Sequence, residues 1–190
     1  MDHARANEYY RKAEEKGNST GALYIGLNHL EGLGFAKSAE AAIPWFSKAA
    51  EAGNSEAMFQ LGLLAQNGKG MDQDHVAALG WFSRAAADGN AAASFALGAA
   101  HEFAKGVSEN PQLAFFWYKR AADLGDSDAY NNLGQSYRDG YGVEKDTAQA
   151  LLWLQKGVDV DDPFALANLG KVYLAGDGVE ADRAKGLALL

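Results

Sequence analysis

Residues 57–89 read AMFQLGLLAQNGKGMDQDHVAALGWFSRAAADG, and the pattern of this stretch recurs along the chain every 36 residues. Four tryptophans and five glycines keep this interval without insertion or deletion: Trp45, Trp81, Trp117 and Trp153, and Gly26, Gly62, Gly98, Gly134 and Gly170. A fixed period of this length is typical of a stacked-repeat architecture, in which each unit packs only against its neighbours. Positions that repeat therefore describe the scaffold, and a binding partner is specified by positions that do not repeat.

Each repeat contains two helical patterns. The first places Ala57 and Leu61 four residues apart, on one apolar stripe of a helix. The second places Ala78, Trp81 and Ala85 on a stripe with helical spacing. The recurring glycine lies inside the first stripe, where it costs roughly 1 kcal/mol relative to alanine, so we expect a second helix to pass too close for a Cβ. We expect the tryptophan to fill the space at this glycine and all four tryptophans to be largely buried.

Capping residues mark the ends of the helices. Side chains that accept hydrogen bonds from the first amides of a helix recur before the second helix, at Ser38, Asp74, Asn110, Asp146 and Asp182. Glycine follows the same helix as its C-terminal cap, at Gly53, Gly89 and Gly125. Connections this short make consecutive helices antiparallel neighbours. The sequence therefore predicts an all-α protein, a solenoid of 36-residue helix pairs.

The period divides the chain into the units of a single solenoid domain, residues 1–190. A partial unit, 1–18, matches the register of the second helix, and we expect it to form an N-terminal cap. Four full repeats follow, over 19–54, 55–90, 91–126 and 127–162. The last unit, 163–190, stops inside a repeat, so we expect the chain to be a fragment of a longer protein.

The composition argues against two classes of partner. The chain of 190 residues carries a formal net charge of −8, whereas a nucleic-acid binder or a protein that adheres to anionic membranes needs a basic face. No stretch approaches the ~18 uninterrupted apolar residues of a membrane span, and the N-terminus has no apolar signal-peptide core. The absence of cysteine removes disulfides and thiolate metal sites but leaves the compartment open.

The second and fourth repeats carry the fullest motif. Its residues are Ala57, Leu61, Gly62, Gly68, Gly70, Asp74, Ala78, Trp81, Arg84, Ala85, Ala86 and Gly89, and Ala129, Leu133, Gly134, Tyr137, Gly140, Gly142, Val143, Asp146, Ala150, Trp153 and Lys156. They resemble the Sel1-like repeat, a relative of the tetratricopeptide repeat, and the resemblance covers essentially the whole chain. It implies a right-handed superhelix of helix pairs whose first helices line a concave face.

The resemblance also implies a function, that of a non-catalytic interaction module. Such a module binds a protein or peptide segment as an adaptor, a regulatory scaffold or a toxin-immunity protein. The alternative is an enzyme, because some cysteine-rich secreted members of the family are described as β-lactamases. This chain lacks every cysteine of that branch and any Ser-x-x-Lys sequence on a suitable turn. The oligomeric state stays open, as does the compartment: bacterial cytoplasm, or periplasm or exterior once a leader is removed.

No catalytic, cofactor or metal site is predicted. His29 and His101 stand 72 residues apart, two repeats along the solenoid, so we do not expect them to converge on one metal. The Gly-x-Gly sequences, such as residues 68–70, precede a capping residue and do not follow a strand, which favours inter-helix turns over phosphate loops. Asp159, Asp161 and Asp162 lack the ligand spacing and the terminal glutamate of a calcium loop, so we expect Asp162 to cap a helix.

Contact residues for a partner are expected on the first helix of each repeat. With the repeat glycine counted as zero, the related tetratricopeptide geometry points positions −3, +1 and +4 into the concave groove. The predicted contact residues are Leu23, Leu27, Phe59, Leu63, Phe95, Asn131, Gln135 and Arg138. Two interpretations stay open: the residues at −3 only seal adjacent repeats, or the apolar strip binds a helix or an extended segment. Phe116, on the second helix, is a separate candidate for an exposed aromatic.

Overall fold

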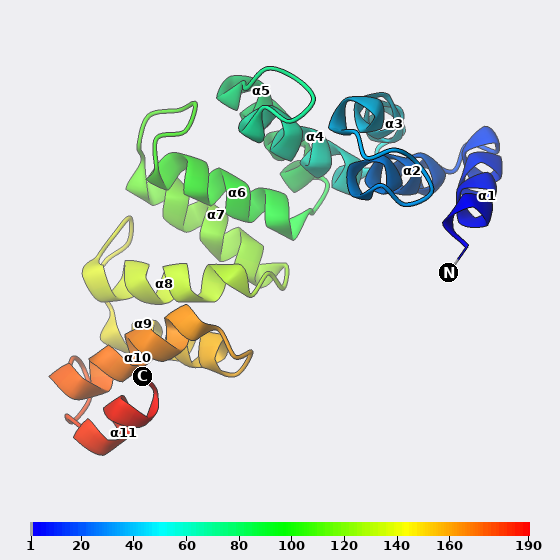
Figure 1. Ribbon diagram of the computed structural model, residues 1–190. Coiled ribbons are helices and arrows are strands. Elements are labelled where there is room, and N and C mark those ends of the chain that lie inside the picture. Colours follow the sequence, from blue (N-terminus) through cyan, green and yellow to red (C-terminus); the bar gives the residue numbers. More distant parts are fainter. Residues whose placement is uncertain (1) are drawn as a thin grey trace. The chain divides into compact units, whose positions relative to one another are not determined.

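The computed structural model describes residues 2–190, and within them the chain forms helices and turns without any strand (Figure 1). The helices are α1 (His3–Glu15), α2 (Ser19–Glu31), α3 (Ala39–Glu51), α4 (Ser55–Asn67), α5 (His75–Ala87), α6 (Ala91–Glu102), α7 (Pro111–Asp123), α8 (Asp128–Asp139), α9 (Thr147–Val158), α10 (Pro163–Ala175) and α11 (Arg183–Ala188). The predicted all-α class and the repeating pairs of helices are confirmed.

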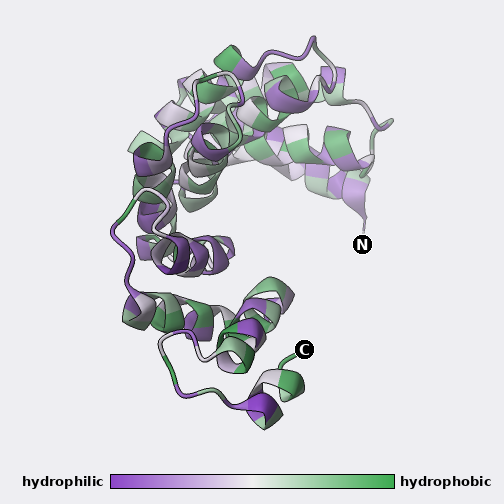
Figure 2. Cartoon of the chain, turned by 90° about the vertical axis from the view of Figure 1, so that its left-hand side faces the viewer, coloured by the Kyte–Doolittle hydropathy of each residue, from purple (hydrophilic) through white to green (hydrophobic). Residues whose placement is uncertain are grey.

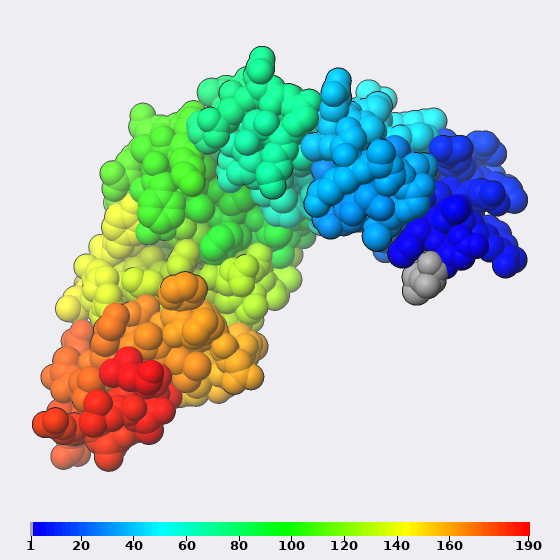
Figure 3. All heavy atoms as spheres, in the orientation of Figure 1, coloured from blue at the N-terminus to red at the C-terminus, as the bar shows by residue number. Residues whose placement is uncertain are grey.

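The helices group into two compact units, one that ends at Ala93 and one that begins at Ser94. In the first unit each helix from α1 to α5 packs against the next one along the chain. In the second unit the same holds from α7 to α11, and α8 also contacts α10. Figure 2 shows hydrophobic and hydrophilic residues mixed on the helices, and Figure 3 shows successive helix pairs of each unit closely packed. Each unit is thus a short stack of helix pairs.

The predicted caps are present. Side-chain oxygens that accept a hydrogen bond from a backbone N–H of the following second helix come from Ser38, Asp74, Asn110, Asp146 and Asp182. The first helices are capped in the same way by Asn18, Asn54, Asn90 and Asp162. Each such cap satisfies an amide that the helix itself cannot, which typically contributes about 1 kcal/mol. The helix boundaries therefore follow from local sequence.

The interior glycines pack against the residue that follows each tryptophan. A Cβ added to Gly62 would lie 2.4 Å from the ring of Phe82, and one added to Gly98 would lie 2.6 Å from the ring of Tyr118. The equivalent pairs are Gly26 with Phe46 and Gly134 with Leu154. These four partner side chains are at most 1% exposed. The expectation that tryptophan fills the space at the glycine is therefore wrong, because the next residue along the helix fills it.

The tryptophans flank this core. Trp153 is buried, whereas Trp45, Trp81 and Trp117 are half-buried. Trp81 and Trp117 each have a cationic side chain three residues further on that lies over the ring, as in the pair of Arg84 over Trp81 at 4.6 Å from the ring centre. An exposed cation–π contact of this kind contributes about 0.5–1 kcal/mol. The most conspicuous residue of the repeat thus lies at the margin of the core in three of four copies.

Two turns place a residue other than glycine in the left-handed backbone region. Ala104 has φ of 52° and Asp161 has φ of 59°. The same repeat positions one unit earlier hold Gly68 and Gly125, with φ of 63° and 93°. Both turns therefore keep the left-handed backbone conformation without glycine. This conformation costs roughly 1–2 kcal/mol for a residue that has a Cβ.

Replacing Gly62 with alanine tests the close approach of glycine and ring. The added methyl would collide with the fully buried Phe82, so we expect the free energy of unfolding to fall by about 1–3 kcal/mol. Gly80→Ala is the matched control, because Gly80 is exposed within α5 and has no atom within 4 Å of its would-be Cβ. That substitution should stabilise the chain by up to about 1 kcal/mol. Equal gains in urea unfolding for both variants would contradict the packing.

Replacing Ala104 with glycine relieves a left-handed residue. We expect Ala104→Gly to raise the free energy of unfolding by about 1 kcal/mol, because glycine adopts this conformation freely. The reverse change, Gly53→Ala, should lower it by a similar amount, since Gly53 has φ of 81° and no neighbour within 4 Å of an added Cβ. Thermal unfolding of both variants checks the pair; an unchanged melting temperature for Ala104→Gly argues against strain at this turn.

Candidate functional site

The predicted contact residues are divided between the two units. The first unit holds Leu23, which is buried, and Leu27, Phe59 and Leu63, which are half-buried. The second unit holds Asn131, which is buried, and Phe95, Gln135 and Arg138, which are half-buried. In the first unit Leu63 lines a hollow of about 360 Å³ together with Leu30 and Gln60, and Leu23, Leu27 and Phe59 do not line it.

The two phenylalanines at position −3 cover the buried ring beneath the repeat glycine. The ring centre of Phe59 lies 5.8 Å from that of Phe82, and that of Phe95 lies 5.3 Å from that of Tyr118. Both pairs are tilted, as aromatic contacts in protein cores usually are. Each ring therefore packs against the second helix of its own repeat, and part of its surface stays exposed.

The second unit carries two hollows along one side of α8. The first, termed here the Phe164 hollow, has a volume of about 470 Å³ and is lined by Phe95, Ser127, Asp128, Asn131, Asn132, Val160, Asp162, Pro163 and Phe164. The second, the Tyr141 pocket, has about 190 Å³ and is lined by Glu102, Tyr118, Asn132, Gln135, Ser136, Asp139 and Tyr141. Asn132 belongs to both, so we call the two together the α8 face.

The Phe164 hollow combines exposed apolar side chains with amides. Phe164 is 71% exposed and Val160 is 50% exposed. Asp162 accepts a hydrogen bond from the backbone N–H of Phe164 at 2.9 Å, which anchors the start of α10 and hence the ring that it carries. On the α8 side, Asn131 accepts a hydrogen bond from the side-chain amide of Asn168 at 2.8 Å. The exposed ring of Phe164 therefore lines the same hollow as the amide group of Asn131, which a hydrogen bond fixes in place.

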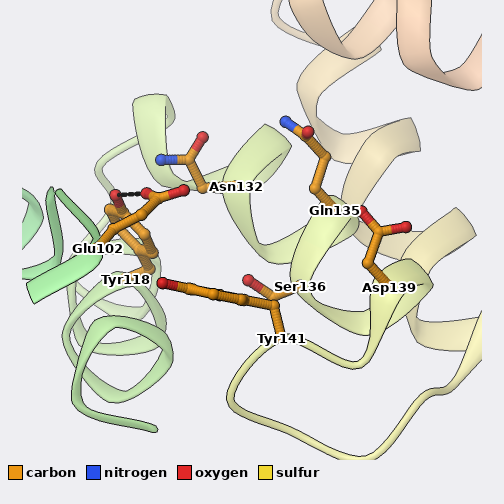
Figure 4. Close-up of a pocket in the computed structure, with 7 residues that line it drawn as sticks. All are labelled: Glu102, Tyr118, Asn132, Gln135, Ser136, Asp139 and Tyr141. Atoms are coloured by element: carbon orange, nitrogen blue, oxygen red, sulfur yellow. Dashed lines mark hydrogen bonds between the residues drawn. The ribbon is translucent and has the colours of Figure 1, made fainter. Parts of the chain in front are cut away.

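The Tyr141 pocket is polar and bordered by two phenols. Figure 4 shows the ring of Tyr141 extending across one side of the pocket toward the Glu102–Tyr118 pair. The hydroxyl of Tyr118 donates a hydrogen bond to a carboxylate oxygen of Glu102 at 2.5 Å. The hydroxyl of Tyr141 donates to Glu109 at 3.2 Å. Each phenol is thus hydrogen-bonded to a carboxylate, and one of these, Glu102, lines the pocket.

The titration of these groups follows their surroundings. Burial, followed by the hydrogen bond to Glu102 and its charge, raises the pKa of Tyr118 well above its ordinary value. Burial and the hydrogen bond to Glu109 raise the pKa of Tyr141. Both phenols therefore stay protonated at neutral pH and act as donors. The guanidinium of Arg138 bonds both carboxylate oxygens of Asp139, at 2.8 and 2.9 Å, and lowers the pKa of that carboxyl.

Comparison with a family model accounts for the repeat. The model of the Sel1 repeat matches residues 2–18, 19–54, 55–90, 91–126, 127–162 and 163–190. The chain belongs to the Sel1 repeat family. No curated protein matches the chain significantly.

Solved Sel1 repeat structures superpose on this chain. A Sel1 repeat protein from Oxalobacter formigenes is 31% identical, with a TM-score of 0.87 over 100% of this chain and 80% of that one. A protective antigen of uropathogenic Escherichia coli strains with an SLR fold is 30% identical, with a TM-score of 0.92 over 99% of this chain and 40% of that one. The chain thus spans less than half of the antigen. An immunity protein from Pseudomonas aeruginosa, 21% identical with a TM-score of 0.60 over 100% of this chain and 68% of that one, supports the fold alone.

Several residues of the α8 face were not among the predicted contact residues. Phe164 and Val160 lie outside the three counted positions of the Sel1 repeat, at the corner between α9 and α10. A signal for Phe164 exists in the sequence, because an aromatic directly after a capping Asp162 and Pro163 stands in the first turn of a helix. Ser136 and Tyr141 carry no such signal. The exposed aromatic predicted on the second helix is confirmed, since Phe116 is 51% exposed.

The histidines and acidic residues of these Sel1 repeats do not gather into a metal site within residues 2–190. His29 stacks on Phe35 with ring centres 4.0 Å apart, and burial, then the charge of Arg11, lowers its pKa. The Gly-x-Gly sequences form turns between helices, as predicted. Across the same residues, no helix combines the length and the apolar character that crossing a membrane requires.

Proposed function

We propose that the chain is a non-catalytic interaction module that binds a segment of a partner protein across the α8 face. Sel1 repeats are generally protein-interaction modules. The observation that carries the proposal is the exposed ring of Phe164, which lines a hollow of about 470 Å³ beside Val160 and Asn131. Exposed aromatic side chains next to polar groups are typical of interface hot spots.

The chemistry of the hollow supports a peptide segment as the ligand. Phe95, Val160 and Phe164 offer apolar surface to a side chain of the partner. Asn131 and Asn132 carry amides that both donate and accept hydrogen bonds, which is what a peptide backbone requires. Gln135 continues this polar lining into the Tyr141 pocket. The combination supports binding of an extended or helical segment with an apolar residue over Phe164.

The first unit offers further contact positions under the same proposal. Leu27, Phe59 and Leu63 keep part of their side chains exposed, whereas Leu23 contributes mainly to packing. The proposal covers three types of module: an adaptor, a regulatory scaffold and a toxin-immunity protein. The immunity protein from Pseudomonas aeruginosa supports the last of these only through a shared fold. No arrangement of described residues favours a β-lactamase-like enzyme, and we expect no turnover of a chromogenic β-lactam.

A peptide library tests the proposal. We expect random peptides displayed on phage to yield binders of the immobilised chain, with dissociation constants measurable by calorimetry. Phe164→Asp or Phe95→Asp should weaken binding at least ~30-fold, about 2 kcal/mol, because an aromatic anchor is lost. Phe103→Asp is the matched control, since Phe103 is 61% exposed but does not line the hollow. Circular dichroism should show the same helix content for Phe164→Asp and Phe103→Asp. Phe95→Asp also removes a contact with the buried ring of Tyr118, so Phe164→Asp is the more direct test.

Two results would count against this site. Binding that survives both the Phe164 and the Phe95 substitution would exclude the Phe164 hollow. Binding that is lost in Phe116→Asp instead would place the segment on α7, where Phe116 lines a separate hollow with Phe115 and Leu124.

A further inference from the structure

We infer that the Tyr141 pocket receives the guanidinium of an arginine side chain carried by the bound segment. This inference rests on the proposed function, because it assigns one residue of the partner that crosses the α8 face. Three features of the pocket carry it: the sign of its charge, the serine hydroxyl that is directed into it, and the ring that borders it.

The pocket is lined by carboxylates and by no cationic side chain. Glu102 and Asp139 line it directly, and Glu109, outside the lining, accepts the hydrogen bond of the Tyr141 hydroxyl. Asp139 is already paired with Arg138 through both carboxylate oxygens. Glu102 accepts a hydrogen bond from Tyr118, and within residues 2–190 it forms no ion pair. One uncompensated carboxylate therefore faces the pocket, and it favours a cation over an anion or a neutral apolar group.

Ser136 is a second, independent indication of a ligand. The residue is only 4% exposed, and it lines the pocket. Figure 4 shows this hydroxyl directed into the space above the ring of Tyr141. This oxygen is reached from the pocket, so an N–H donor that enters the pocket can bond it in place of water.

The shape and chemistry of the pocket suit guanidinium. Its planar group carries five N–H donors, which can bond Glu102, Ser136 and the amide oxygen of Gln135 at once. The same plane stacks on an aromatic face such as that of Tyr141. A volume of about 190 Å³ is sufficient for the head group of one side chain. A metal ion fits less well, because no three acidic or histidine side chains among residues 2–190 are placed to hold one.

A titration with a single capped amino acid isolates the pocket from the rest of the site. The probe is N-acetyl-arginine methylamide, and its neutral isostere N-acetyl-citrulline methylamide is the ligand control. We expect the arginine probe to shift the amide resonances of residues 132–141 with millimolar affinity, and the citrulline probe to bind at least ~5-fold more weakly. Glu102→Gln should weaken the arginine probe by about 10-fold, because glutamine keeps the acceptor for Tyr118 but removes the charge. Glu51→Gln, on the exposed end of α3, should leave its affinity unchanged.

The inference is overturned if both probes bind equally, or if Glu102→Gln binds the arginine probe as tightly as the natural chain does. Should Glu102→Gln fail to fold, Ser136→Ala decides, with an expected loss of at least ~3-fold and an unchanged affinity as the contrary result. These outcomes are separable from those of the proposed function. Peptides whose binding depends on Phe164 but which contain no arginine would support the α8 face as the binding site and contradict the arginine pocket.

Discussion

The close approach of an interior glycine to a buried side chain of the partner helix is the contact on which this fold depends. Gly62 against Phe82 and Gly98 against Tyr118 bring two helix backbones nearer than a Cβ would allow. Because the ring then fills the space between the helices, it is almost completely removed from water. The remaining faces of the first helix stay available for residues that vary between repeats. Asn131 and Gln135 of α8 occupy two such positions.

The period of 36 residues was sufficient to predict the fold class and the caps. Helix boundaries depend on capping residues, such as Asp74 and Asn110, that can be recognised in the sequence. The sequence did not indicate which residue of the second helix contacts the glycine. Trp81 and Phe82 are adjacent apolar residues about 100° apart on the helix, so periodicity ranks them equally. Only the rotation of the helix about its axis places Phe82 inward and leaves Trp81 half-buried.

The candidate site was predicted in part, and the reason is again geometric. Phe95, Asn131 and Gln135 occupy counted positions of the first helices and line the α8 face. Phe164 and Tyr141 come from a helix start and from a turn, where the spacing of a helix no longer indicates direction. Ser136 reads as an ordinary helical serine, and its role depends on what surrounds its hydroxyl in three dimensions. Residues that repeat thus describe the scaffold, and the site draws on residues that do not.

Hydrogen–deuterium exchange in the presence of a selected peptide tests most directly whether the α8 face is the binding surface. Bound peptide should slow exchange in the amides of α8 and in the first turn of α10, with no change in α7 or α9. Amides at helix starts and in exposed turns respond most, because they open locally without unfolding the unit. Protection confined to α7, around the exposed Phe116, with α8 unchanged, would contradict the account.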